Sequence, residues 1–368
     1  MRKRLNFRQA LVLSAALVSA MLLGALPTHA ASDFYKGKRL TMLINFAPGG
    51  PTDIEGRLVA RFLTQYLEGN AGVIIQNMDG AGGVIGINYL GEIAPRDGTM
   101  IGFVTGAAFQ HAIEPLSRKV DLKTYEFVAH QTGTNVYYLR TDVKPGMKTA
   151  TDIMKAENVV AGGLSADSTK DLLMRLGLDV LGVKFNYVTG YKSNQNARMA
   201  LQQGEVNMFS ESPPGYRSIV EPSLVAKGEV IPVFHDPFYD GKKYFTSKQM
   251  EGLNIPTLPE LYTKIYGKPP SGPKWDAYLA VVLLSNSMLR QIIMPPKSPP
   301  EAVNALREAM KRLNTDPAFA KESMTAFGFV PEWSATADVN EVVRNNMELD
   351  PKIRQFIIDY MKNRSGKG

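Results

Sequence analysis

The 368-residue chain contains no cysteine and only four histidines. The absence of cysteine excludes disulfides, a thiol nucleophile, zinc–thiolate sites and iron–sulfur clusters. The histidines, His29, His111, His130 and His235, show no H-x-H or H-x-x-x-H spacing, so we expect neither a histidine metal site nor a cofactor. With 44% hydrophobic and 21% charged residues, the composition is that of a globular protein.

Acidic side chains are absent from residues 1–30, which carry four basic ones. An apolar stretch over residues 10–26 is shorter than the ~20 residues that span a membrane, and Thr28-His29-Ala30 follows as an approximate A-x-A cleavage site. This pattern predicts a secretory signal cleaved after about Ala30. Without residues 1–30 the net charge falls from +7 to +3, with 38 basic and 35 acidic residues, so we expect no nucleic-acid partner.

Short apolar strands alternate with helical patterns in two parts of the chain. Residues 40–46 read as a strand, and Thr52-Asp53-Ile54-Glu55 has the form of a capping box at a helix start. Similar patterns follow over 72–104 and over 159–209. The alternation predicts parallel sheets with helices on their faces. Two lobes are expected because a chain of this length exceeds the size of a single core.

The later part of the chain differs from this pattern. Residues 236–275 are rich in Pro, Gly, Lys and Tyr, which predicts a long surface excursion with one short helix near residues 258–266. Helix starts are expected at Ser298, Asp316 and Asp350, each followed by proline.

Two glycine-rich loops, residues 46–53 and 80–83, each lie between a predicted strand and a predicted helix. In open α/β sheets ligands bind at this edge, and exposed amides at a helix start favour an anion. We therefore expect the two loops to converge on one anionic group. The alternative is that the glycines only permit tight turns.

The second half offers polar residues at equivalent places. Ser165, Ser168 and Thr169 cluster at a predicted helix start, with a simple N-cap as the alternative for Ser168. Glu211, at a strand end, is expected to face solvent, or else a ligand hydroxyl or amine. No G-x-G-x-x-G, phosphate loop or nucleophile elbow occurs, so we do not expect an enzyme.

Three ordered motifs resemble one known family. They are Phe46-Ala47-Pro48-Gly49-Gly50-Pro51-Thr52-Asp53, Gly80-Ala81-Gly82-Gly83-Val84-Ile85-Gly86 and Ala94-Pro95-Arg96-Asp97-Gly98-Thr99. They are similar to the Bug family, the TctC-like extracytoplasmic receptors of tripartite tricarboxylate transporters. Tyr191-Lys192 and residues 204–207 and 255–257 match weaker landmarks of the family.

The resemblance implies an α/β, type II-like periplasmic binding protein of the Venus-flytrap kind, each lobe a sheet flanked by helices. We expect a signal peptide (1–30), lobe 1 (31–132), lobe 2 (133–232), a return to lobe 1 containing the excursion (233–300) and C-terminal helices (301–368). Such a receptor would act as a monomer in the periplasm and deliver a small carboxylate to membrane permease subunits. A loaded receptor for a sensor kinase and an exported enzyme using the same cleft are the alternatives.

The resemblance also implies which residues hold the ligand. In lobe 1 they are Phe46, Ala47, Gly49, Gly50, Thr52, Asp53, Ala81, Gly82, Gly83, Thr105 and Gly106. In lobe 2 they are Ser165, Ser168, Thr169, Tyr191 and Ser210, which would confer selectivity among acids.

Overall fold

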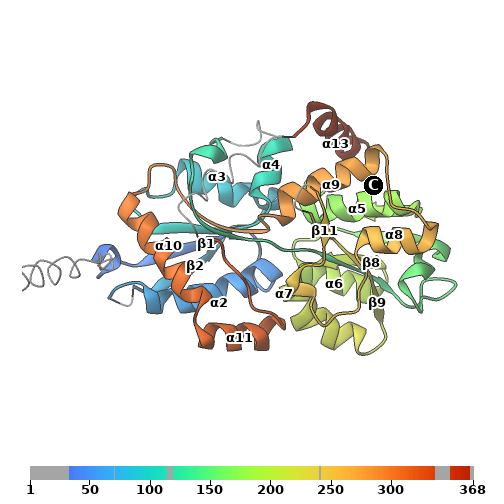
Figure 1. Cartoon of the computed structure of the whole chain (residues 1–368), viewed down its shortest axis with the longest axis horizontal. Helices are drawn as coiled ribbons and strands as arrows, with labels where there is room; N and C mark the ends of the chain where they lie inside the picture. Colours follow the sequence, from blue (N-terminus) through green and yellow to red (C-terminus); the bar gives the residue numbers. More distant parts are fainter. Residues whose placement is uncertain (1–32, 70, 114–118, 240–241, 336–348, 365–368) are drawn as a thin grey trace, which may run out of the picture.

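The computed structural model describes residues 33–69, 71–113, 119–239, 242–335 and 349–364. Two five-stranded sheets, each with helices packed on it, form two lobes that lie side by side (Figure 1). The predicted two-lobed α/β fold is therefore confirmed. The predicted signal peptide and its cleavage point after Ala30 lie outside the described residues. Within the described part of the chain, no helix is both long enough and apolar enough to cross a membrane.

The first sheet consists of β1 (Leu40–Ile44), β2 (Val73–Asn77), β3 (Met100–Val104), β4 (Glu126–Gln131) and β12 (Arg290–Met294). Its strand order is β2-β1-β3-β12-β4. β1 pairs in parallel with β2 and β3, whereas β12 lies antiparallel between β3 and β4. Strands covered on both faces are apolar along their length, and β3 is buried at every position.

Helices cover both faces of this sheet. They are α2 (Pro51–Tyr66), α3 (Val84–Glu92), α4 (Ala107–Ile113), α10 (Pro300–Asn314) and α11 (Pro317–Phe327), with short 3₁₀ turns at Asp33–Tyr35, Ala81–Gly83 and Leu122–Thr124. Alternate residues of a strand face opposite sides: Met42 packs with α2, α10 and α11, while Leu43 packs with α3 and α4.

The second sheet consists of β5 (Val136–Arg140), β6 (Val159–Gly162), β7 (Phe185–Val188), β8 (Met208–Glu211) and β9 (Val230–His235), in the order β7-β6-β8-β5-β9. Its helical elements are α5 (Thr169–Leu181), α6 (Asn194–Gln203), α7 (Pro213–Gly215), the π-helix η6 (Tyr216–Val225), α8 (Leu258–Tyr266), α9 (Pro273–Asn286) and α13 (Pro351–Arg364), with 3₁₀ turns at Ala150–Lys155 and Lys248–Met250. β6 runs parallel to β7 and β8, and β5 is antiparallel to β8 and β9.

The excursion after β9 belongs with the second lobe. It contains the hairpin of β10 (Phe238–Tyr239) and β11 (Tyr244–Phe245), and α8 spans the residues predicted to be helical. Leu258, Leu261 and Tyr278 are buried in the same core as α5. The chain rejoins the first sheet at β12, whereas the sequence placed the return at residue 233. The reason is that β9 pairs with β5 up to His235 and that α8 and α9, which follow it, pack in the core of the second lobe.

Two of the predicted helix caps differ in the structure. α2 begins at Pro51 after Gly50, without a side-chain cap, so Thr52 and Glu55 do not form a capping box. The N-cap of α10 is Pro299 rather than the predicted Ser298, whose hydroxyl donates to the Pro295 carbonyl.

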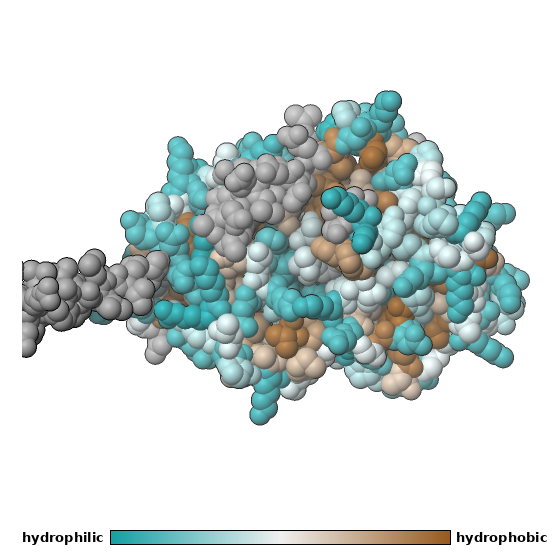
Figure 2. Space-filling model, in the orientation of Figure 1, coloured by the Kyte–Doolittle hydropathy of each residue, from teal (hydrophilic) through white to brown (hydrophobic). Residues whose placement is uncertain are grey.

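Hydrophilic side chains predominate on the face shown in Figure 2, with apolar surface in separate patches.

Candidate functional site: an anion-binding cleft between the lobes

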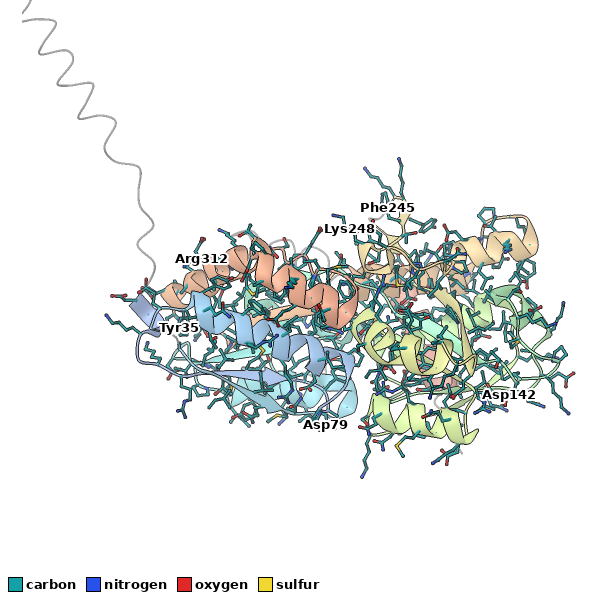
Figure 3. The ribbon with its side chains drawn as sticks, turned by 90° about the horizontal axis from the view of Figure 1, so that it is seen from below. Tyr35, Asp79, Asp142, Phe245, Lys248 and Arg312 are labelled. Carbon is teal, nitrogen blue, oxygen red and sulfur yellow. The ribbon has the colours of Figure 1, made fainter. Side chains whose placement is uncertain are left out.

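A cleft lies where loops of the two lobes meet. Its outer cavity, of about 280 Å³, is bordered by loops that follow β1, β2, β6 and β7. A smaller inner cavity of about 50 Å³ shares Phe46, Thr52, Gly82 and Asn194 with it, and extends to Arg290 at the start of β12. Figure 3 shows Asp79, which lines the outer cavity, at the end of the first lobe that faces the second.

Four helix N-termini border this cleft. Thr52 lies in the first turn of α2, Gly83 precedes α3, Thr169 begins α5 and Asn194 begins α6, and all four residues line one of the two cavities. The first N–H groups of a helix have no partner within it, and the helix dipole places positive potential there. Two helices from each lobe thus direct positive potential towards one space, which favours an anion.

Asn45 holds the loops of the first lobe together. Its side-chain amide donates to the carbonyls of Gly83 (3.3 Å) and Thr105 (3.0 Å), and its oxygen accepts from the Thr105 N–H (3.1 Å). Asn45 directly follows β1 and is fully buried, so one side chain fixes the loops after β1, β2 and β3. These loops therefore border the cleft as one preformed surface.

Asp53 stabilises the loop before α2. Its carboxylate accepts from the Gly49 N–H (2.9 Å), Arg57 (2.8 Å) and Asn77 (2.8 Å). Burial alone would raise the pKa of Asp53, but these hydrogen bonds together lower it. Asp53 therefore stays ionised and acts on the loop rather than on the cleft.

Glycine is required in the loop after β2 for two reasons. Gly83 has φ +96°, and a Cβ there would lie 2.3 Å from the Asn45 amide nitrogen. Gly82 has φ +60°, and its Cβ would approach the Ser168 N–H nitrogen of the second lobe to 3.6 Å. A side chain at Gly82 would enter the space between the two lobes.

Lys170 is the charged residue that the second lobe brings to the inner cavity. Its Nζ donates to the Ser210 carbonyl (3.0 Å) and lies 4.2 Å from the centre of the Phe209 ring. Burial lowers the pKa of Lys170 below its ordinary value, and the nearby charges of Asp171 and Glu211 offset this effect only in part.

Arg290 joins the lobes at the inner cavity. Its guanidinium donates to Glu55 of α2 (3.0 Å), to the Thr105 hydroxyl (3.3 Å) and to the Ser212 hydroxyl of the second lobe (2.8 Å). The Gln131 amide donates to the other Glu55 oxygen. Arg290 and Glu55 are almost completely buried, so their charges balance each other away from water.

No family model matches the chain. Curated relatives do: a UPF0065 protein from Cupriavidus necator is 24% identical over 325 residues, 86% of each chain. Another, from Agrobacterium vitis, is 28% identical over 184 residues, which cover 48% of this chain and 52%, about half, of that protein. BugT from Bordetella pertussis is 37% identical over 71 residues, 19% of this chain and 21% of BugT.

Solved structures with the same fold include the periplasmic binding protein BugD (TM-score 0.64, 18% identity, 88% of this chain and 98% of that one). The chain resembles the Bug family in both sequence and fold. An adipate-bound protein from R. palustris has a TM-score of 0.66 (17% identity, 92% and 99% covered), and malate-bound MatC from Rhodopseudomonas palustris one of 0.59 (18% identity, 89% and 98% covered). The resemblance inferred from the three sequence motifs is thus confirmed.

The structure brings most of the residues implied by the Bug-family resemblance to the cleft. The outer cavity is lined by Phe46, Ala47, Gly50, Thr52, Ala81, Gly82, Gly83, Ser165 and Tyr191. The inner cavity adds Thr105, Gly106, Ser168 and Thr169. Ser168 is also the N-cap of α5, because its hydroxyl accepts from the Asp171 N–H.

Three of the implied residues lie outside both cavities. Gly49 and Asp53 bond to each other within their loop. The Ser210 hydroxyl is buried in β8, with no hydrogen-bond partner among the described residues. Glu211, which we expected to face solvent, is completely buried and pairs with Arg198. It faces neither solvent nor the two cavities.

Sequence reasoning missed several polar residues of the cleft. Asn194 and Ser212 line it, as do Lys170 and Arg290. Lys170 follows the predicted cap residues Ser168 and Thr169 directly, so its place in the first turn was a usable signal. No local sequence signal marked Arg290, because its hydrogen-bond partners Glu55, Thr105 and Ser212 lie far away in the sequence. Among the described residues, no group of three or more His, Asp or Glu side chains is placed to hold a metal ion.

Proposed function

We propose that this protein is a periplasmic solute-binding receptor that captures a small organic carboxylate between its two lobes. The observation that carries the proposal is the convergence of four helix N-termini, two from each lobe, on one cleft. An anion held there interacts with both lobes at once, so it favours the conformation in which they are close together.

The comparisons support an acid as the ligand. Two proteins of the same fold are described with bound adipate and malate, both of which carry carboxylates. The sequence also has no G-x-G-x-x-G, phosphate-loop or nucleophile-elbow motif. We therefore propose binding rather than catalysis, with the membrane permease subunits of a tripartite tricarboxylate-type transporter as the partners of the loaded receptor.

Thermal denaturation with a panel of organic acids tests this function. At 100 times its dissociation constant, a ligand that binds only the folded state stabilises it by about 2.7 kcal/mol. At least one mono- or dicarboxylate should therefore raise the melting temperature, whereas the matching uncharged amides should not. Stabilisation by sugars or cations, with no response to any carboxylate, would contradict the proposal.

A further inference from the structure

Lys170 retains unused hydrogen-bonding capacity at the inner cavity. An ammonium group has three donors, and within the described residues one of them is used, by the Ser210 carbonyl. The Phe209 ring covers another side of the group at 4.2 Å. Thr169 and Ser212, which carry hydroxyl groups, also line this cavity. A carboxylate accepts hydrogen bonds from both ammonium and hydroxyl groups.

The acidic residues near Lys170 are bonded to other groups. Asp171 accepts from the Ser165 N–H (2.9 Å) and the Tyr187 hydroxyl (3.1 Å). Glu211 forms its ion pair with Arg198. In the described part of the chain, neither carboxylate comes within the 4.0 Å of an ion pair with Lys170.

The inner cavity therefore carries one positive charge without a direct partner. Its other cation, Arg290, is balanced by Glu55 at 3.0 Å. Lys170 is half-buried, and a charge that is partly withdrawn from water gains from a paired anion, so an anion beside Lys170 gains more than it would from a fully exposed lysine. The cavity of about 50 Å³ can hold a group the size of a few water molecules, such as a carboxylate.

We propose that Lys170 binds a second anionic group of the ligand, so that the cleft selects an acid with two anionic groups over a one-headed acid of the same length. This inference rests on the proposed function, in which the first anionic group occupies the outer cavity at the glycine loops. Lys170 is then the residue that determines specificity, and the glycine loops supply binding common to both kinds of acid.

Titration calorimetry with matched acids tests the inference. Succinate is compared with butyrate, glutarate with pentanoate, and adipate with hexanoate. The wild-type protein should bind the diacid of the best-fitting length at least about tenfold more tightly than its monoacid. In Lys170→Met, affinity for that diacid should fall about 10- to 100-fold, the range of a charged hydrogen bond. Affinity for the monoacid should change less than about threefold.

Two further variants serve as controls. Lys352→Met removes the same charge from the second residue of α13, where the side chain is exposed, and should leave the diacid preference unchanged. Lys170→Arg keeps the charge and should retain most of the preference, which separates the effect of charge from an effect on folding. Melting temperatures of the ligand-free variants report folding directly.

The results distinguish this inference from the proposed function. If wild-type protein binds diacid and monoacid equally, or if Lys170→Met weakens both to the same degree, the role of Lys170 is refuted while carboxylate binding stands. If wild-type protein binds none of the six acids but responds to sugars or cations, both proposals fail.

Discussion

His235 is a single residue whose titration should affect stability. It is completely buried at the end of β9, and its Nδ1 lies 2.8 Å from the Asp236 carbonyl. A carbonyl only accepts, so Nδ1–H is the donor and Nε2 is unprotonated, with no partner among the described residues. Burial lowers the pKa of His235 to about 4, although the Asp236 carbonyl and Glu260 favour the proton.

This lowered pKa predicts a loss of stability in mild acid. Between about pH 6.5 and pH 4 the unfolded chain binds a proton at His235 and the folded protein does not, so stability falls as the pH falls. Relative to His235→Asn, whose amide can replace the Nδ1–H donor, the wild type should lose about 3 kcal/mol of unfolding free energy from pH 7 to pH 4. Urea denaturation at several pH values measures this difference.

The comparison with His235→Asn is needed because the neighbouring Asp236 has the opposite effect on stability in acid. Burial raises the pKa of Asp236, despite hydrogen bonds from Tyr278, Asn135 and Tyr137, so this carboxyl favours the folded state in acid. A difference between wild type and His235→Asn that stays constant from pH 7 to pH 4 would contradict the assignment to His235.

Individual site residues could be predicted only where the signal was local. Gly82 and Thr52 lie in short motifs that mark a loop and a helix start. Glu55 looked like part of the same helix start, but its partner Arg290 is 235 residues away. Glu211 looked like an exposed strand end because its partner Arg198 lies on another element. Pairing across the fold is not visible in such motifs.

At the scale of elements, the loop after β2 should control access to the cleft. Asn tolerates the left-handed backbone better than most residues, and Gly82 has φ +60°. Gly82→Asn should therefore fold, while its side chain fills space next to Ser168 and lowers carboxylate affinity at least about tenfold. Calorimetry with the acid that binds wild-type protein measures this effect.

Gly228→Asn is the matched control. Gly228 has a similar φ of +72°, with no atom within 4 Å of a Cβ placed there, so it introduces comparable backbone strain away from the cleft. We expect its affinity to stay within about twofold of wild type. Equal losses of affinity in the two variants would show that strain, rather than filling of the cleft, is responsible.

Elements with strong local patterns were predicted well. The strand expected over residues 40–46 corresponds closely to β1, and α11 begins after Asp316 as its N-cap. The hairpin of β10 and β11 was not predicted, because each strand has two residues and no periodicity. The position of β12 between β3 and β4 also has no local signal.

At the scale of the whole molecule, the lobes share part of their packing. α4 directly follows β3 of the first sheet in the chain. Its Phe109 is nevertheless buried in the same core as α5 and α9 of the second lobe. Arg354 of α13 donates to the carbonyls of Ala112 and Ile113 (both 2.9 Å). In the same helix, the Tyr360 hydroxyl donates to Asp179 of α5 (2.6 Å). α13 thus connects elements of both lobes.

This shared packing predicts that the lobes unfold together. Differential scanning calorimetry should give one transition, with a calorimetric enthalpy close to the van't Hoff enthalpy. Added carboxylate should move this transition as a whole to higher temperature. Two resolved transitions, of which the ligand shifts only one, would show that the lobes are independent units.

The insertion of β12 in the first sheet also sets an order for folding during synthesis. β3 and β4 each pair with β12 rather than with one another. The strands that emerge first therefore cannot form their final sheet until residues 290–294 are available. The first sheet remains incomplete until most of the polypeptide has been made.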